Sequence, residues 1–332
     1  MGDSHWEGEM KDFRKFIVVL GVACMLLLSG FVGRAQEMPS DYQEVLKLLG
    51  RNGDYKDKVL KVNIPRIDLK VNIAGVATPT PFGFGGWVAM TKGEGGQVVM
   101  MGDLVLLQEE VNPVMSALLD GGLDVTALHN HFFWEEPRIF FMHIHGHGKA
   151  VDLARKVKPA IDLMGHVTAS VAPTKSTPTA TPPAEGTLDT DKIAAVVGHK
   201  GEQFGPVYKI TLGRDDLTVK ERGAIINSRM GLNTWAAFVG SKEDAQVAGD
   251  VAMKETEISQ VLKALRKNGL NVVAIHHHMT TAQPTVIFLH YWGRGSAEKL
   301  ASGFKAGLDE LGRSKHANTA LHPAATSRGT SR

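Results

Sequence analysis

Six histidines in this chain form two matching triplets, one in each half of the sequence: His129, His131, His143, His276, His278 and His290. The two stretches that carry them align without a gap at an offset of roughly 147 residues. Neutral imidazole is the commonest metal-ligating side chain, and it also carries protons near neutral pH. The repeated triplet therefore indicates a binding or reactive site, although it names no substrate.

The first triplet lies in a predicted β-hairpin that turns around residues 135–138. Side chains at i and i+2 of a strand share a face. If the loop is odd in length, His131 pairs with His143 and His129 pairs with His145, so that all four imidazoles lie on one face. Neighbours on one face are about 5 to 7 Å apart at Cβ and can converge on one ion. An even loop would put the pairs on opposite faces.

The second hairpin has one histidine fewer. The same register places His278 opposite His290 and His276 opposite Trp292. Three imidazoles with water in a fourth position is the ligand set of many catalytic metal sites. In the first hairpin, His145 or Glu135 could complete the set instead.

Seven histidines are therefore candidate ligands of a divalent transition metal, zinc, copper or iron: His129, His131, His143, His145, His276, His278 and His290. Two alternatives stay open. The histidines could be hydrogen-bonded structural residues, or they could bind a ligand without a metal.

Each hairpin is followed by a basic residue between two glycines, and these six are candidate ligand-binding residues: Gly146, His147, Gly148, Gly293, Arg294 and Gly295. They join a strand to a helix, and a helix N-terminus favours anions. The alternative is that the glycines serve only the turn.

The N-terminus has the pattern of an export signal. A basic stretch precedes an apolar run over residues 16–32, and small residues predict cleavage after Ala35. The protein is expected to be exported, to the periplasm or outside the cell. A single membrane anchor is the alternative. The only cysteine, Cys24, lies inside the apolar run, so a cleaved chain would have only nitrogen and oxygen ligands for a metal.

The composition is that of a globular protein with two modest domains: 332 residues, 43% hydrophobic and 22% charged. The net charge of +2 predicts no attraction to nucleic acid. The expected partner is an unidentified small molecule or envelope ligand, with membrane contact only through an uncleaved signal.

The order of strand and helix patterns predicts an α+β fold of two tandem repeats, each a mainly antiparallel sheet with two helices, related by a pseudo-twofold axis. The boundaries follow from composition: signal peptide 1–35, first repeat domain 36–165, Pro/Thr/Ala-rich linker 166–191, second repeat domain 192–312 and disordered tail 313–332.

Several other residues repeat with the histidines. Asn112-Pro113 predicts the start of a helix, and Glu110 and Glu257 next to helix starts are expected to be structural. Asp103 and Asp250 follow a glycine and could orient an imidazole or cap a turn. The tryptophans at 87 and 235 are expected in the core.

The sequence resembles the LppY/LpqO lipoprotein-like family of bacteria, a duplicated domain of unknown function. The resemblance covers nearly the whole mature chain and is carried by residues 102–106, 126–131, 142–148, 231–238, 274–279 and 289–295. It implies a bacterial origin and an envelope location, and it implies no activity. This chain lacks the lipidated cysteine of that family, which favours a soluble exported form.

Two hypotheses follow. In the first, the hairpin histidines bind a transition metal, with hydrolytic or oxidative chemistry at the second-half site of His276, His278, His290 and water. In the second, the protein is a metal-free binding module whose groove between the repeats holds a small or anionic ligand.

Overall fold

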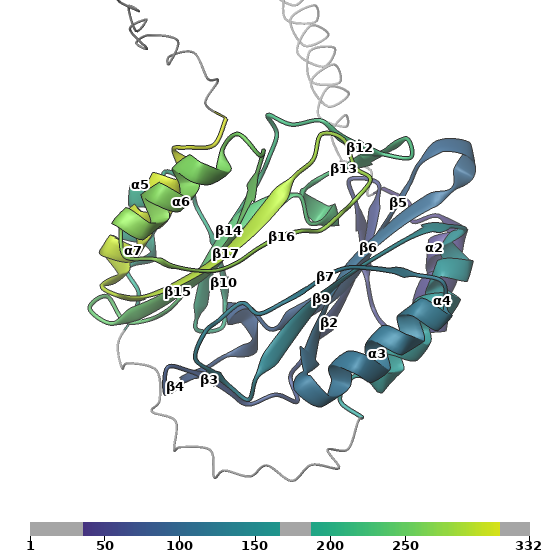
Figure 1. The fold of residues 1–332 in the computed structure, drawn as a ribbon, viewed down its shortest axis with the longest axis horizontal. Coiled ribbons are helices and arrows are strands. Elements are labelled where there is room, and N and C mark those ends of the chain that lie inside the picture. Colours follow the sequence, from purple (N-terminus) through teal and green to yellow (C-terminus); the bar gives the residue numbers. More distant parts are fainter. Residues whose placement is uncertain (1–35, 167–186, 313–332) are drawn as a thin grey trace, which may run out of the picture. The chain divides into compact units, whose positions relative to one another are not determined.

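The computed structural model describes residues 36–166 and 187–312, and both halves have the same order of elements (Figure 1). The predicted signal peptide and tail, and most of the predicted linker, lie outside the described residues. Residues from Met38 onward form one compact unit. Within the described ranges, no helix combines the length and the apolar character needed to cross a bilayer.

The first repeat has a six-stranded antiparallel sheet of order β1-β2-β5-β6-β9-β7. Its strands are β1 (Asp54–Lys56), β2 (Val59–Pro65), β5 (Gly85–Lys92), β6 (Val98–Leu107), β7 (Asp124–His129) and β9 (Ile139–Gly148). The helices are α2 (Ser40–Leu49), α3 (Gln108–Asp120) and α4 (Ala150–Leu163). A small sheet adds β3 (Val71–Ile73), β4 (Val76–Thr78) and β8 (Glu135–Glu136), and short 3-10 turns lie at η1 (Thr80–Phe82) and η2 (Glu94–Gly96).

The second repeat has the matching sheet of order β10-β11-β14-β15-β17-β16. Its strands are β10 (Glu202–Phe204), β11 (Val207–Gly213), β14 (Asn233–Gly240), β15 (Ala245–Met253), β16 (Asn271–His277) and β17 (Ile287–Gly295). The helices are α5 (Thr190–Val197), α6 (Ile258–Lys267) and α7 (Ala297–Leu308). The pair β12 (Val219–Glu221) and β13 (Ala224–Ile226), and the 3-10 turn η3 (Ser228–Met230), complete it. The α+β fold of two antiparallel repeats is thus confirmed.

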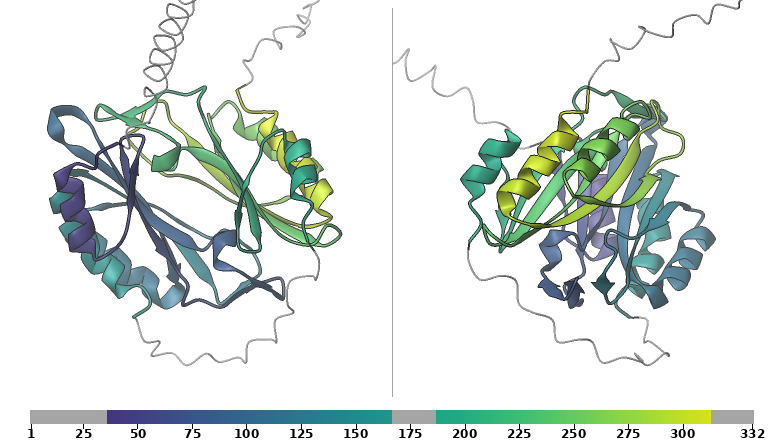
Figure 2. Two further views of the ribbon diagram at one scale, coloured as in Figure 1. Left: turned by 180° about the vertical axis from the view of Figure 1, so that it is seen from behind. Right: turned by 60° about the vertical axis from the view of Figure 1, so that its left-hand side comes forward.

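Each sheet has an outer face covered by helices and an inner face turned toward the other repeat (Figures 1 and 2). In β2, alternate residues Leu60, Val62 and Ile64 join the apolar cluster under α2, α3 and α4. The residues between them point the other way, because successive side chains of a strand alternate. Polar side chains on the strands are therefore brought to the interface between the repeats.

The inner faces pack through two apolar clusters that contain residues of both repeats. In one cluster, Val99 and Met101 of β6 lie with Phe288 of β17. In the other, Phe141 of β9 lies with Trp292 of β17. These two clusters therefore hold the sheets together. They also exclude water from the polar side chains that lie between them.

Glu110 and Glu257, which we expected to be structural, each form a buried ion pair. A guanidinium nitrogen of Arg66 lies 2.6 Å from Glu110, and Arg214 lies 3.0 Å from Glu257. Glu110 also accepts a hydrogen bond from the backbone N–H of Gly165, at 2.6 Å. Each glutamate thereby connects a helix start to the first strands and to the end of the repeat.

The helices differ from the sequence prediction in two respects, the start of α3 and the number of helices in each repeat. Helix α3 begins at Gln108, before Asn112-Pro113, because the Glu110 carboxylate accepts the Leu107 N–H and so satisfies the helix start earlier. Each repeat also has three helices instead of two.

The additional helix in the second repeat, α5, begins at the edge of the predicted linker. The side chain of Asp189 accepts the N–H of Lys192 and caps the helix. Ile193 and Val197 then pack into the core of the second repeat.

Candidate metal centre

The six repeated histidines line the inner faces of the two sheets. His143 and His290 lie in the middle of β9 and β17, and His129 and His276 lie at the ends of β7 and β16. His131 and His278 follow β7 and β16 in the chain.

The register of the first hairpin differs from the prediction. His129 lies opposite Phe141 instead of His145. His131, which was expected to pair with His143, lies beyond the end of β7. The shift is an even number of residues, so the side chains of His129 and His143 still share one face of the sheet.

The second hairpin has the same shift. His276 lies opposite Phe288 instead of Trp292, and His290 lies opposite Ala274 instead of His278. Because both hairpins shift alike, the two repeats keep matching histidine positions.

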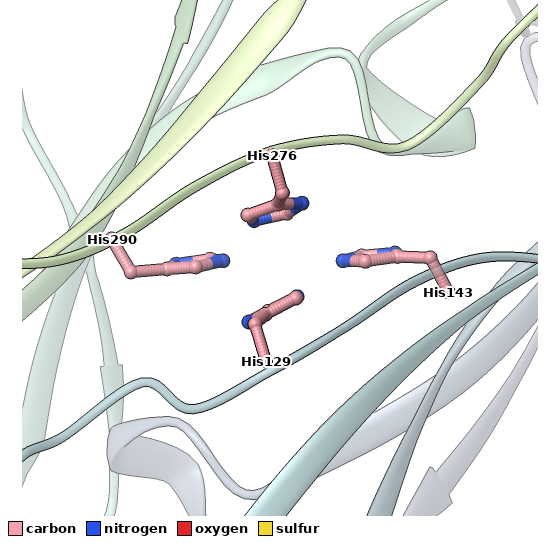
Figure 3. A group of neighbouring side chains, drawn as sticks. All are labelled: His129, His143, His276 and His290. Atoms are coloured by element: carbon pink, nitrogen blue, oxygen red, sulfur yellow. The ribbon is translucent and has the colours of Figure 1, made fainter.

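One histidine from each of four strands meets the others between the repeats, and we call these the four-histidine group: His129, His143, His276 and His290 (Figure 3). One ligand nitrogen from each ring lies within 4.8 Å of those of the other three. The rings of His129 and His276 are 3.8 Å apart between centroids, and His143 and His290 approach from opposite sides. The sequence predicted one site in each hairpin, whereas the structure brings ligands from both repeats into one group.

The remaining two histidines flank this group symmetrically. The ring of His131 stacks on His290 at 3.7 Å, and the ring of His278 stacks on His143 at 3.9 Å. Each of them therefore packs against a member of the four-histidine group that comes from the other repeat. Their contacts tie the positions of the two hairpins to each other.

Burial lowers the pKa of all six imidazoles below the ordinary value of 6.5. For His276 the pKa falls to about 4. Mutual repulsion between charged rings lowers the pKa of His143 and His290 further. At neutral pH the rings are therefore uncharged, which is the form that ligates a metal.

Two backbone carbonyls select the nitrogen that faces the centre. The Nδ1 atom of His129 lies 3.4 Å from the Asn130 oxygen, and Nδ1 of His276 lies 3.2 Å from the His277 oxygen. A carbonyl only accepts, so Nδ1 holds the proton and Nε2 keeps its lone pair. Both Nε2 atoms are buried without a hydrogen-bond partner in the described residues.

A buried aspartate stands beside a histidine in each sheet. Asp103 lies directly opposite His143 on the neighbouring strand, and Asp250 lies opposite His290. An oxygen of Asp250 is 3.9 Å from Nε2 of His278. Burial raises the pKa of Asp103 to about 8 and raises that of Asp250 strongly, with the charge of Asp103 adding to it. These mid-strand positions fit the orientation of imidazoles better than the capping of turns.

A cavity of about 480 Å³ adjoins the four-histidine group. Matching residues of both repeats line it: Lys61, Trp87, Asp103, Lys209, Trp235 and Asp250. His131, His278 and His290 form the part of its wall nearest the group. The cavity thus connects the histidines with two ammonium groups and two indole rings.

The sequence analysis did not single out the lysines of this cavity, and it assigned the tryptophans to the core. Nζ of Lys61 lies 4.7 Å from the centre of the Trp87 ring, and Nζ of Lys209 lies 4.1 Å from the Trp235 ring. Both tryptophans pack against the apolar clusters between the repeats, in line with the core expectation, but their rings are only half-buried and also line the cavity. The occurrence of the two lysines at equivalent positions of the repeats could have identified them as candidate site residues.

Besides His131, two predicted ligands of the first hairpin lie outside the four-histidine group. Nε2 of His145 is 2.8 Å from a carboxylate oxygen of Glu221 in the second repeat. Glu135 is buried, 3.5 Å from the Asn130 side-chain amide. Each has a polar neighbour of its own.

The candidate ligand-binding residues after the hairpins lie at the ends of β9 and β17: Gly146, His147, Gly148, Gly293, Arg294 and Gly295. A Cβ at Gly146 would lie 2.7 Å from Leu123, so packing against a side chain explains this glycine. His147 is exposed, and the exposed Arg294 pairs with Asp244 at 2.7 Å. The structure brings none of these six into the four-histidine group.

The chain belongs to a family whose description is Domain of Unknown Function (DUF1259). The family model matches residues 43–163 and 191–310, which together are more than half of the chain. The two matches confirm an uncharacterised domain that is present in duplicate. A search of curated proteins gave no match.

Among solved structures, the chain has low similarity to bacterial microcompartment shell proteins. A trimeric shell protein, PduB, is 10% identical over 77% of this chain and 89% of its own, with a TM-score of 0.18. EtuB from Clostridium kluyveri is 9% identical over 78% of this chain and 90% of its own, with a TM-score of 0.19. These TM-scores are too low to show a shared fold.

Proposed function

We propose that this protein binds one divalent transition metal ion, zinc, copper or iron, in the four-histidine group between its repeats. The observation that carries the proposal is the convergence of four neutral imidazoles, one from each of four strands, with their ligand nitrogens within 4.8 Å of one another. The unpartnered Nε2 atoms of His129 and His276 support it further, because buried polar atoms without a partner are unfavourable.

The spacing suits a metal after a small contraction. Four nitrogens bound tetrahedrally at about 2.1 Å would be about 3.4 Å apart. The observed limit of 4.8 Å requires side chains to move by roughly an ångström, which rotation about their χ angles can supply. The donor set contains only imidazole nitrogen, which suits zinc, copper and iron.

The site also supports hydrolytic or oxidative chemistry on a bound small molecule. An ion held by all four imidazoles would act there as a Lewis acid only if it took a fifth ligand or released one histidine, and copper or iron could also carry electrons. His131 and His278 line the cavity as neutral imidazoles, and each can form hydrogen bonds with its contents. Asp103 and Asp250 stand beside His143 and His290 and can hold those rings in position.

The test is elemental analysis of the full chain, purified without a histidine tag, against a His129→Ala/His276→Ala double variant. The exposed His147→Ala variant is the matched control. We expect about one metal per chain in the parent and the control, and none in the double variant. Two metals per chain would indicate separate sites in the repeats. A parent that stays metal-free and takes up no zinc, copper or iron would contradict the proposal.

A metal-free binding module is the second candidate function, and the cavity lined by Lys61 and Lys209 favours it. In that case the histidines would be walls of the ligand site. The elemental analysis separates the two candidates, because only the first requires a bound metal.

We further propose that the protein is an exported member of the LppY/LpqO-like group, periplasmic or secreted. The basic and apolar N-terminal pattern and the repeated histidine hairpins support this. Mass spectrometry of the protein from cell fractions should find a chain that begins at Gln36 in the periplasm or the medium. A full-length chain confined to the cytosol would contradict this localisation.

A further inference from the structure

We propose that the cavity beside the four-histidine group binds a small carboxylate with a flat carbon skeleton, placed between Lys61 and Lys209 and against the rings of Trp87 and Trp235. The inference rests on the proposed function, because it makes the carboxylate the substrate of the metal centre.

The charge argument begins with the two lysines. They come from matching strands, β2 and β11, and both line the one cavity. Each ammonium lies over an indole ring, at 4.7 Å for Lys61 and 4.1 Å for Lys209. A cation over an aromatic face keeps donors free for another partner, since the ring offers no lone pair. Two such ammonium groups at one cavity favour an anion.

The lysines are desolvated enough to need that partner. Burial lowers the pKa of both to about 8, and the positive charge of Lys61 lowers that of Lys209 further. Both are still mainly protonated at neutral pH. An anion between them would relieve this repulsion, and it would replace hydration that the cavity withholds.

The two carboxyl groups of the cavity lie near histidines and also attract the lysines. Asp103 lies opposite His143 in the sheet, and an oxygen of Asp250 is 3.9 Å from Nε2 of His278. Asp103 attracts Lys61 and Asp250 attracts Lys209, but burial raises the pKa of Asp103 to about 8 and that of Asp250 strongly, so both carboxyls are mainly protonated at neutral pH. Neither lysine forms an ion pair within the described residues, so each ammonium keeps donors for a ligand.

The flat skeleton is inferred from the tryptophans. Each indole lies beside a glycine of the other repeat. A Cβ at Gly231 would lie 2.9 Å from Trp87, so the absence of a side chain there leaves room for that ring, whereas a Cβ at Gly83 would make ordinary contact with Trp235 at 3.9 Å. Both rings line the cavity. Stacking on such rings favours a planar ligand. The volume of about 480 Å³ is in the range of small-molecule sites.

The experiment is calorimetric titration of the zinc-loaded full chain with benzoate and with benzamide, which has the same shape and no charge. The test variant is Lys61→Gln/Lys209→Gln. The control variant is Lys263→Gln/Lys299→Gln, which removes two exposed lysines from α6 and α7. We expect benzoate to bind the parent and the control, and the test variant to bind it roughly 10- to 100-fold more weakly. Benzamide should bind the parent as weakly as benzoate binds the test variant.

Metal content and thermal unfolding are measured on the same samples. Loss of benzoate binding with zinc content and melting temperature unchanged supports the inference. Equal affinity of parent and test variant for benzoate, or of the parent for benzoate and benzamide, overturns it and leaves the metal centre standing. Charge-dependent benzoate binding by a protein that takes up no metal supports the anion site and overturns the proposed metal function. Quenching of tryptophan fluorescence by benzoate, lost in Trp87→Phe/Trp235→Phe, gives a second readout that does not depend on the lysines.

Discussion

The two repeats carry matching polar residues where they face each other and differ at the edges of that interface. The matching residues include Lys61 with Lys209 and Asp103 with Asp250, in addition to the three pairs of histidines. All of them line the cavity or the four-histidine group. A duplicated domain that kept only its packing residues would have kept apolar side chains here.

At the edges of the interface, corresponding positions of the two repeats carry different residues. His145 of the first repeat corresponds to Trp292 of the second. His145 contacts Glu221 at 2.8 Å, whereas the indole N–H of Trp292 donates to Gln246 at 3.1 Å. His145 and Trp292 thus contact different partners, so these two positions serve packing. The centre, by contrast, needs matching residues from both repeats at once.

The largest expected effect is on the free energy of unfolding, and it comes from the buried arginine–glutamate ion pair that is present in each repeat. Glu110→Gln and Glu257→Gln each leave a buried arginine without its full partner, and each should lower the free energy of unfolding by about 3–5 kcal/mol. Denaturation in urea measures it. Because the repeats form one compact unit, each variant should shift a single transition. Two separate transitions would show that the repeats unfold independently.

The next effect is on metal affinity. His143→Ala and His290→Ala remove equivalent candidate ligands of the proposed metal site from opposite repeats. One ligand in four corresponds to about 2.5–4 kcal/mol of a zinc affinity of about 10–16 kcal/mol, or roughly a 100- to 1000-fold loss. Competition with a chromophoric chelator measures it. A large loss in only one of the two variants would break the equivalence of the repeats.

The free energy of unfolding of the metal-free protein should depend on pH through the buried histidines of both repeats. The pKa of each histidine is lower in the folded state than the ordinary 6.5, so the unfolded chain binds more protons as the pH falls. Stability is therefore complete above about pH 7 and is lost below about 6.5, by up to about 1.4 kcal/mol per pH unit for each buried histidine. The raised pKa values of Asp103 and Asp250 act in the opposite direction, but two carboxyls are outnumbered by six imidazoles.

Unfolding curves at pH 7, 6 and 5 check this prediction in the parent and in two single variants. His131→Gln and His278→Gln should each reduce the slope by about one proton. A parent whose stability is flat over this range would show that the imidazoles are not held neutral.

The smallest effect is expected outside the centre. Arg294→Ala breaks an exposed ion pair with Asp244 and should cost less than about 1 kcal/mol. Its metal content and benzoate affinity should equal those of the parent. A lower metal content or a weaker benzoate affinity in this variant would indicate that the ends of β9 and β17 contribute to the site.

The sequence by itself determined the duplication, the antiparallel hairpins and the imidazole donor set. The alternation of residues in strands puts His129 and His143 on one face only if the loop is odd in length, and the sequence left that parity open. The sequence was enough to identify Glu110 and Glu257 as structural partners of the helix starts.

Only the tertiary structure decided which histidines meet. The register depends on the bulge between Val125 and Ala127 and on packing against the other sheet, and no local pattern encodes either. The sharing of one group by both repeats follows from the buried contact between the inner faces. Lys61 and Trp87 are brought together by the pairing of β2 with β5, which are separated in the chain by β3, β4 and η1, so their role in the cavity is a property of the assembled sheets.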